Sequence, residues 1–170
     1  RVCASTSSIV SVHTSLGACT LLKFGNDMQK EKFLIPLASG EKLGAFSLTE
    51  PNAGTDASGL QTTAKLDGDE YVINGNKIFV TNGKEADIYI LAAVTDKEQG
   101  TKGISAFIVE KGTPGFSFGT KEKKMGIHAS STYELIFQNC RIPKENLIGE
   151  EGQGFKIAMQ GLDGARIGIA

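Results

Sequence analysis

Side chains and backbone groups suited to ligand binding gather in the segment 45–59, AFSLTEPNAGTDASG. The hydroxyls of Thr49, Thr55 and Ser58 and the backbone N–H groups can form hydrogen bonds, and the segment contains no lysine or arginine. This composition suits a neutral polar ligand better than a bare phosphate, and it favours binding over nucleophilic attack. A glycine- and proline-rich surface connection would have the same composition, so the segment alone leaves both interpretations open.

Short β-rich runs must position this segment. Alternation that ends at Leu48 predicts a strand, and Pro51 with the glycines after it predicts a long irregular loop. We predict strands over 44–48, 62–66, 70–74, 77–81, 88–94, 103–110 and 131–138. Asp67-Gly68 and Asn74-Gly75 are typical of compact hairpin turns. The middle of the chain is therefore predicted to be a predominantly antiparallel β-barrel or sandwich of about seven strands.

Residues 4–24 have the apolar spacing of a helix that ends at Gly25. The apolar stripe consists of Ile9, Val12, Leu16, Cys19 and Leu22. His13 lies in the middle of this helix, and we interpret it as a packed or surface histidine rather than a catalytic one.

A second helix is predicted to begin at Asn26 as the N-cap, with Gln29 as its capping-box partner. Leu34 and Ile35 are expected to face inward, and Pro36 with the glycine at position 40 is expected to end the helix.

After a hinge rich in glycine and glutamate at 149–154, a third helical stripe is formed by Phe155, Met159, Leu162 and Ile169. Asp163 and Arg166 lie three residues apart on one side of this helix, as an intrahelical ion pair or as ligand-binding groups. Because the chain begins at Arg1 and ends at Ala170 inside a helical pattern, we expect it to be a fragment of a longer protein.

Composition makes several classes of protein poor candidates. With 18 basic and 19 acidic residues the charge is nearly balanced, which argues against nucleic acid as a partner. Cys3, Cys19 and Cys140 are too few and too scattered for a disulfide framework, and neither histidine stands at metal-ligand spacing from them. No apolar run approaches the length of a membrane span and no signal peptide is recognised, so we expect a reduced, cytoplasmic protein.

Four segments in register resemble the acyl-CoA dehydrogenases, most closely the bacterial short-chain, butyryl-CoA-type enzymes. They are LTEPNAGTD, GNKIFVTNG, MGIHASSTYELIFQNCRIPKENLIGEEGQGFKIAM and LDGARIGIA. The resemblance implies an α+β fragment with three parts: residues 1–42 end an N-terminal helical domain, 43–150 form a middle β-domain, and 151–170 begin a C-terminal helical bundle. It also implies FAD as cofactor, an electron-transferring flavoprotein as electron acceptor, and a homotetrameric parent protein.

The same resemblance implies the site residues. The residues expected to bind FAD are Phe46, Ser47, Leu48, Thr49, Gly54, Thr55, Phe79, Val80 and Thr81, and those expected to contact the acyl-CoA are Thr55, Asp163 and Arg166. Phe79 stands where the family often has tryptophan. The catalytic base is expected to be a glutamate beyond Ala170, and Glu50 is interpreted as an anchor of its loop rather than the base.

The function implied is the oxidation of a short-chain acyl-CoA to the trans-2-enoyl-CoA, by a parent protein of which this chain supplies the FAD platform and part of the CoA site. We expect the chain alone to be inactive. Two alternatives remain open: a non-catalytic binding or assembly module, and an acyl-CoA oxidase or nitroalkane-oxidase-like flavoenzyme on the same scaffold. The absence of a GxGxxG or Walker motif disfavours a pyridine-nucleotide enzyme.

Overall fold

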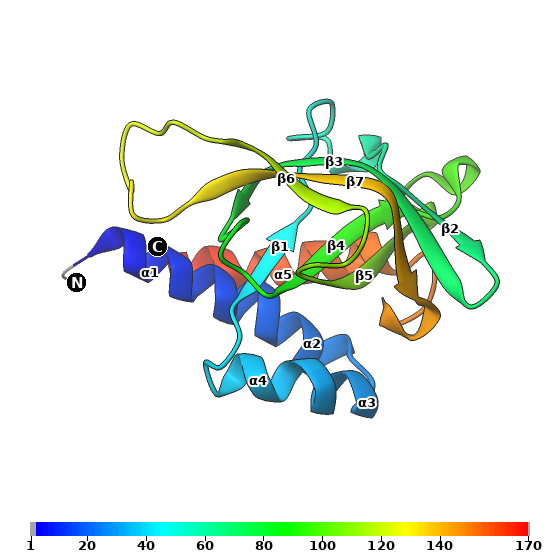
Figure 1. Ribbon diagram of the computed structural model, residues 1–170, viewed down its shortest axis with the longest axis horizontal. Coiled ribbons are helices and arrows are strands. Elements are labelled where there is room, and N and C mark those ends of the chain that lie inside the picture. The colour runs from blue at the N-terminus through cyan, green and yellow to red at the C-terminus, as the bar shows by residue number, and fades with distance from the viewer. Residues whose placement is uncertain (1–2, 170) are drawn as a thin grey trace.

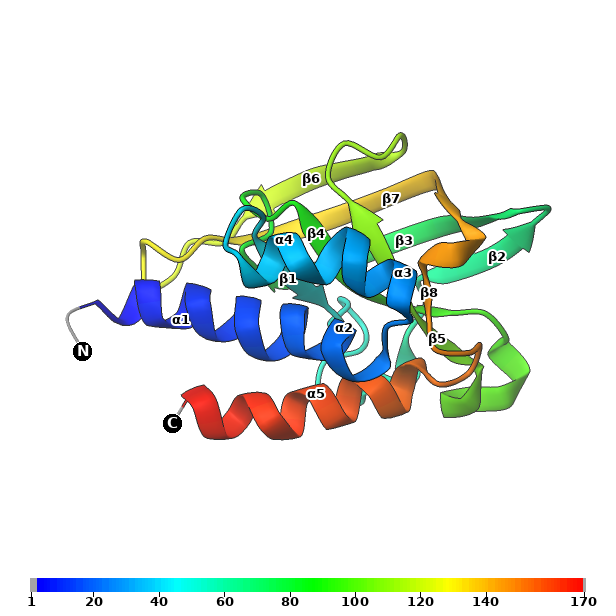
Figure 2. The ribbon, with the colours of Figure 1, turned by 90° about the horizontal axis from the view of Figure 1, so that it is seen from below.

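The computed structural model describes residues 3–169, with side chains through residue 166. The expectations placed on Arg1, Ala170 and the Ile169 side chain therefore lie outside the described residues. Helices precede and follow an eight-stranded sheet. They lie along one side of the sheet, where the first helix of the chain runs between the second helix and the last one (Figures 1 and 2).

Each of the first two helices is interrupted by a π-helical turn. The first helix consists of α1 (Ala4–Val12), a π turn (His13–Ala18) and α2 (Cys19–Phe24). The second consists of α3 (Asp27–Gln29), a π turn (Lys30–Leu34) and α4 (Ile35–Ala38). The last helix, α5 (Gly154–Ile169), follows the sheet.

The π turns correct two predictions about which side chains face inward. A π turn has a wider hydrogen-bond step than an α-helix, so it rotates the apolar stripe that follows it. Leu21 is fully buried, whereas the predicted stripe residue Leu22 is 57% exposed. In the second helix Phe33 and Leu37 are buried, and Ile35, predicted to face inward, is 61% exposed.

The start of the second helix is as predicted. The Asn26 side chain accepts a hydrogen bond from the Gln29 N–H, and the Gln29 side chain accepts one from the Asn26 N–H. The Gln29 amide also donates to the carbonyls of Glu145 and Leu147, both at 2.7 Å, which ties the helix to the end of the sheet. Pro36 does not end the helix, because it stands in the first turn of α4, where its missing N–H costs little.

The sheet has the order β6-β7-β3-β2-β4-β5-β8, with β1 paired to β4. The strands are β1 (Gly44–Ser47), β2 (Thr63–Asp67), β3 (Glu70–Thr81), β4 (Ile88–Val94), β5 (Ile104–Glu110), β6 (Phe116–Lys121), β7 (Thr132–Pro143) and β8 (Leu147–Ile148). Most pairs are antiparallel, as predicted, but β1 and the start of β2 pair in parallel with β4.

The predicted hairpin at Asp67-Gly68 is confirmed, since Asp67 pairs with Glu70 across the turn between β2 and β3. The hairpin predicted at Asn74-Gly75 is wrong. β3 runs through it as one 12-residue strand with a local register irregularity, and Gly75 has φ 142°. A Cβ at position 75 would lie 2.5 Å from the Thr62 hydroxyl, so close approach explains this glycine. The short β8 and the whole of β6 were not predicted.

Every residue of β4 is buried, because its two faces pack against different layers. Ile88 and Ile90 pack against the helices, together with Leu21 and Phe33. Tyr89, Leu91 and Ala93 point to the other side, into a core shared with residues of β3, β5 and β7. The sheet and helices together therefore hold β1 rigidly beside β4. Among residues 3–169 no helix is both long and apolar enough to cross a membrane.

Candidate functional site

Backbone and lysine hydrogen bonds join the two predicted binding segments. The Ile78 N–H of β3 donates to the Thr49 carbonyl at 2.9 Å, and the Lys77 ammonium donates to the Leu48 carbonyl at 2.9 Å. Glu50 and Ala53 exchange two backbone hydrogen bonds of 3.1 Å, which closes the loop after β1 into a tight turn. The end of β1 and the middle of β3 thus form two walls of one structure.

Behind these walls lies a buried ion pair. The Glu50 carboxylate accepts hydrogen bonds from Lys77 at 2.7 Å, from the Gln61 N–H at 2.6 Å and from the Thr62 N–H at 3.0 Å. The side chains of Lys77 and Glu50 are 0% and 4% exposed. The interpretation of Glu50 as a loop anchor agrees with these contacts, which leave its carboxylate pointing away from solvent.

Burial acts on the pKa values of both partners. Burial lowers the pKa of Lys77 to about 8, although the carboxylate of Glu50 opposes the shift. For Glu50, burial by itself would raise the pKa, but the charge of Lys77 and the donated hydrogen bonds outweigh it and hold the pKa below its usual value. Both groups are therefore charged at neutral pH.

Phe79 has an unusual backbone conformation at the rim of the site. Its φ is 57°, in the left-handed region that L-residues other than glycine rarely occupy, and it lies where the pairing of β3 with β7 shifts register between Lys77 and Val80. The residue is 58% exposed. A large apolar side chain held outward on a strained backbone is typical of a residue kept for contact with a ligand.

A cavity of about 430 Å³ opens between these walls and α5. Its lining is Phe46, Leu48, Thr49, Gly54, Thr55, Ala57, Ile78, Phe79, Met159, Leu162 and Arg166. The size is within the range of small-molecule sites. The lining is mostly apolar with a few hydroxyl and backbone groups, and Arg166 supplies a cation at the α5 side.

The sequence-predicted residues fall into two groups. Those that line this cavity are Phe46, Leu48, Thr49, Gly54, Thr55, Phe79 and Arg166. Ser47 and Val80 are buried, and the Ser47 hydroxyl donates to the Ile90 carbonyl at 3.1 Å, so both side chains belong to the core. Asp163 is exposed and is not part of the lining, and within residues 3–169 no ion pair joins it to Arg166.

Thr81 lines a neighbouring cavity of about 520 Å³, which Phe79 also borders. The remaining lining residues are Ser8, Glu122, Lys123, Lys124, Gly126, Ile127, Ser130 and Thr132. Sequence reasoning gave none of these a role in a site. The available sign in the sequence was the pair of apolar residues Met125 and Ile127 on either side of Gly126 after a run of lysines, and the structure shows both side chains exposed. Phe79 therefore lines both cavities.

Sequence reasoning also missed Ile78, Ala57 and Lys77 as parts of the site or of its support. Met159 and Leu162 were recognised only as apolar helix residues, and the structure turns them toward the cavity. Lys77 could have been suspected because a charged residue in a strand that otherwise alternates is a candidate for a buried ion pair.

The lining fits the flavin ring system of FAD. The exposed Phe79 ring and the side chains of Phe46 and Leu48 offer flat apolar contact, while the Thr49 and Thr55 hydroxyls can bond a polar ring edge. A Cβ at Gly54 would meet nothing within 4 Å, so the loop leaves open space there. The donor set is neutral apart from Arg166, which suits the ring better than the pyrophosphate.

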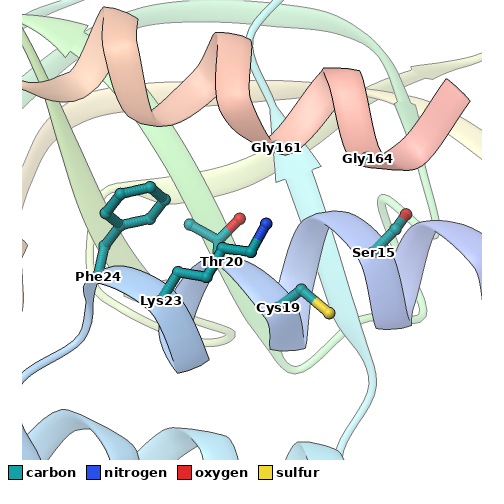
Figure 3. A pocket seen from close by; sticks show the side chains of 7 residues that line it. All are labelled: Ser15, Cys19, Thr20, Lys23, Phe24, Gly161 and Gly164. Atoms are coloured by element: carbon teal, nitrogen blue, oxygen red, sulfur yellow. The ribbon is translucent and has the colours of Figure 1, made fainter.

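A smaller cavity of about 110 Å³ lies between the first helix and α5 (Figure 3). It is lined by Ser15, Cys19, Thr20, Lys23, Phe24, Gly161 and Gly164. Thr20 and Lys23 lie between the two helices, whereas the Cys19 thiol points away from α5. It is too small for a flavin, and none of the predicted site residues borders it.

The linker before α5 packs closely on the sheet and so positions Arg166. The Gly152 N–H donates to the Ser105 hydroxyl at 2.9 Å, and a Cβ at Gly154 would lie 2.3 Å from the Ser105 carbonyl carbon. The Tyr71 hydroxyl donates to the Glu151 carboxylate. Burial, then the hydrogen bond and charge of Glu151, raise the pKa of Tyr71, so this contact persists as a neutral phenol at physiological pH.

The histidines have structural contacts. His13 bridges the Leu37 carbonyl and the Gly44 N–H, and His128 contacts the Lys124 carbonyl at 2.7 Å. In the described part of the chain no group of three histidine, cysteine, aspartate or glutamate side chains is arranged to hold a metal ion.

Comparison with known proteins places the chain among named relatives. Residues 45–140 match the family model "Acyl-CoA dehydrogenase, middle domain" and residues 1–41 match "Acyl-CoA dehydrogenase, N-terminal domain". The short-chain-specific acyl-CoA dehydrogenase of Clostridium acetobutylicum is 59% identical over 170 residues, which are 100% of this chain and 45% of that protein. The chain thus spans less than half the length of this curated relative.

Solved structures give the same result. Butyryl-CoA dehydrogenase from Megasphaera elsdenii superposes with a TM-score of 0.97 at 60% identity, over 98% of this chain and 44% of that one. A chain from a study of the electron-transferring flavoprotein of Acidaminococcus fermentans superposes with a TM-score of 0.96 at 61% identity. The match covers 96% of this chain and 43% of that one. The structure of PigA with FAD and proline superposes with a TM-score of 0.89 at 34% identity, over 94% of this chain and 44% of that one. The chain belongs to the acyl-CoA dehydrogenase family.

Proposed function

We propose that this chain supplies the FAD platform and part of the CoA site of a short-chain acyl-CoA dehydrogenase, which oxidises its substrate to the trans-2-enoyl-CoA. The observation that carries the proposal is the cavity between the end of β1, the Phe79 segment and α5, with apolar walls and Arg166 at one side. The high identity to proteins named as short-chain-specific and butyryl-CoA dehydrogenases supports the choice of substrate class.

The residues of this chain hold and orient the reactants. Phe79 and Leu48 would make apolar contacts with the flavin ring, and the backbone around Thr49 would hold its polar edge. Thr55 and Arg166, from opposite walls, contact the acyl-CoA, and the Arg166 guanidinium provides charge for its polar groups. FAD, when bound, accepts the hydride from the acyl chain. Holding both reactants in fixed geometry is the contribution of this chain to the rate.

We propose that the carboxylate base is supplied from outside this chain, and that the chain alone is therefore inactive. Glu50 does not serve as the base, because its oxygens are occupied by Lys77 and by two backbone N–H groups. Ser47 and Val80 would contact FAD through their backbone groups, because their side chains are buried. Thr81 would contact FAD from the neighbouring cavity that it lines. Asp163, which is exposed, would reach the CoA only at the rim of the site.

The wider setting is also proposed. We divide the chain into an N-terminal helical part (1–42), a middle β-domain (43–150) and the start of a C-terminal helical part (151–170), in a homotetrameric parent protein. The free state of Cys3, Cys19 and Cys140 supports a reducing, cytoplasmic location. An electron-transferring flavoprotein is the proposed electron acceptor, in line with the study from which one similar structure comes.

Anaerobic reduction of the intact protein that carries this chain tests the proposal. Addition of butyryl-CoA to the purified protein should bleach the visible flavin absorption. A protein that contains no flavin, or flavin that butyryl-CoA does not reduce, would contradict the dehydrogenase function. Rapid reaction of the reduced protein with oxygen would instead favour an acyl-CoA oxidase.

Two variants test whether the acyl-CoA binds in the cavity lined by Arg166. Arg166→Gln should raise KM for butyryl-CoA about tenfold, the effect expected from loss of one charged hydrogen bond, while FAD remains bound. Ser58→Ala is the control. The Ser58 hydroxyl contacts Asp56 within the loop that also contains Thr55, and Ser58 does not line the cavity. Equal KM values for the two variants would exclude Arg166 from the substrate site.

A further inference from the structure

Lys77 is a buried cation beside the proposed flavin cavity that does not itself line it. Its side chain is fully buried, and its ammonium has two acceptors, the Leu48 carbonyl at 2.9 Å and the Glu50 carboxylate at 2.7 Å. Burying an ammonium group is costly even when it is paired, and a hydrophobic pair of similar shape often stabilises a fold as well or better. Stability alone therefore gives a weak reason for a lysine at this position.

The Leu48 carbonyl belongs to the peptide that enters the cavity wall. No peptide bond in the described chain is cis, so the Thr49 N–H points opposite to the Leu48 carbonyl and away from Lys77. Leu48 and Thr49 both line the cavity. Within residues 3–169 no group accepts a hydrogen bond from the Thr49 N–H, whereas the Thr49 carbonyl is occupied by the Ile78 N–H.

We propose that Lys77 is a positioning residue that fixes and polarises the Leu48–Thr49 peptide, so that the Thr49 N–H is presented to the cavity as a strengthened hydrogen-bond donor. A cation on the carbonyl oxygen of a peptide withdraws electrons from its N–H, because hydrogen bonds in a chain polarise one another. The group that this N–H would bind is the electron-rich edge of a planar ring. The inference rests on the proposed function, which places a flavin ring in this cavity.

The consequence for a bound flavin is electrostatic. When the flavin is reduced, its ring carries more electron density, and a donor fixed in a dry site stabilises that density without reorganisation. Lys77, through the Leu48–Thr49 peptide, therefore favours the reduced cofactor and raises its reduction potential. Glu50 has the opposite influence, because its negative charge partly cancels that of Lys77.

Reduction potentials of the intact holoenzyme test the proposal, because variants of Lys77 and of Glu50 should shift the flavin potential in opposite directions. Lys77→Met should lower the flavin potential and weaken FAD binding about tenfold, which corresponds to about 1.4 kcal/mol. Lys77→Gln, which keeps an uncharged donor, should lower the potential less. Glu50→Gln removes the counter-charge, and at a pH low enough to keep the Lys77 ammonium protonated it should raise the potential. A purely structural ion pair would destabilise the fold in each variant without opposite shifts in potential.

Asn146→Ala is the matched control. Asn146 is also a buried polar residue, and its amide donates to the Ile108 carbonyl at 2.9 Å, but it does not line the flavin cavity. This variant should lose stability and keep the potential of the unmodified enzyme. A potential that moves as far in Asn146→Ala as in Lys77→Met would overturn the proposal.

Amide hydrogen exchange in the unmodified holoenzyme gives a readout that needs no variant. FAD binding should slow exchange of the Thr49 amide, and an unchanged exchange rate would overturn the role of the Thr49 N–H. Absence of FAD from the unmodified protein would overturn the proposed function and this inference together. Bound FAD whose potential is the same in Lys77→Met, Lys77→Gln and Glu50→Gln would overturn this inference alone.

Discussion

The Nδ1 atom of His13 accepts a hydrogen bond from the Gly44 N–H at 2.9 Å, across 31 residues of sequence. Since Nδ1 is the acceptor, the ring proton is on Nε2, which donates to the Leu37 carbonyl at 3.1 Å. One imidazole thus joins the π turn of the first helix, the end of α4 and the start of β1. This bridge fixes where β1 begins, and β1 leads directly into the wall of the cavity.

His13→Ala should lower the free energy of unfolding by about 2 kcal/mol, because it leaves the Gly44 N–H and the Leu37 carbonyl without their partner. Chemical denaturation measures the change. His128→Ala is the control, since His128 is exposed, and its loss should change stability by less than about 0.5 kcal/mol. Similar losses of unfolding free energy in the two variants would show that the His13 bridge does not contribute to stability.

Phe79→Gly should separate stability from cofactor binding. Glycine tolerates the φ of 57° without strain, so the free energy of unfolding should stay within about 1 kcal/mol of the parent value. Loss of the exposed ring should weaken FAD binding at least about tenfold, as judged by flavin release during titration. Phe79→Tyr, which keeps the flat ring, should retain FAD. Full FAD retention by the glycine variant would exclude Phe79 from the flavin site.

Gly154→Ala should destabilise the protein by about 3 kcal/mol and displace α5, because the new Cβ would lie 2.3 Å from the backbone of Ser105. Gly164→Ala on the same helix should instead stabilise by about 0.5 to 1 kcal/mol, since nothing lies within 4 Å of its Cβ position and alanine favours helix. Thermal unfolding measures both. A loss in Gly164→Ala as large as that in Gly154→Ala would contradict the close packing of the linker.

Stability should depend on pH through Glu50. Its folded-state pKa is held below the ordinary 4.5, where burial is outweighed by Lys77 and the donated hydrogen bonds. The unfolded state therefore binds protons first, so this stabilisation is fully present above the ordinary pKa and is lost as the pH falls through the folded-state pKa. Urea unfolding across that acid range should show the loss.

Glu50→Gln should remove that part of the pH dependence and lower stability at neutral pH by about 3 kcal/mol, because it leaves the Lys77 charge buried without its partner. Glu41→Gln is a suitable control, since Glu41 is exposed and its side chain has no ion pair within the described residues. If the free energy of unfolding of Glu50→Gln fell with decreasing pH as steeply as that of the parent protein, the acid dependence would belong to other carboxylates.

The local sequence predicted those elements whose signals are local. The capping box of Asn26 and Gln29 depends on groups three residues apart, and the turn after Asp67 depends on the freedom of Gly68. Short β-rich runs bounded by turn residues predicted most strands. The same local logic failed at Asn74-Gly75, where the chain continues straight because β7 pairs with both halves of β3 and Thr62 leaves no room for a side chain.

The sequence by itself determined the order of helices and strands, the family motifs and the set of residues that could bind a flavin, because periodicity and turn chemistry act over a few neighbours. Only the tertiary structure decided which of these residues meet. It brought Arg166 to the loop that contains Thr55, turned Ser47 and Val80 into the core, and placed Lys77 behind Leu48. Such contacts arise from packing across long sequence separations, and the π turns and the φ of Phe79 arise from the same packing, so no local pattern encodes them.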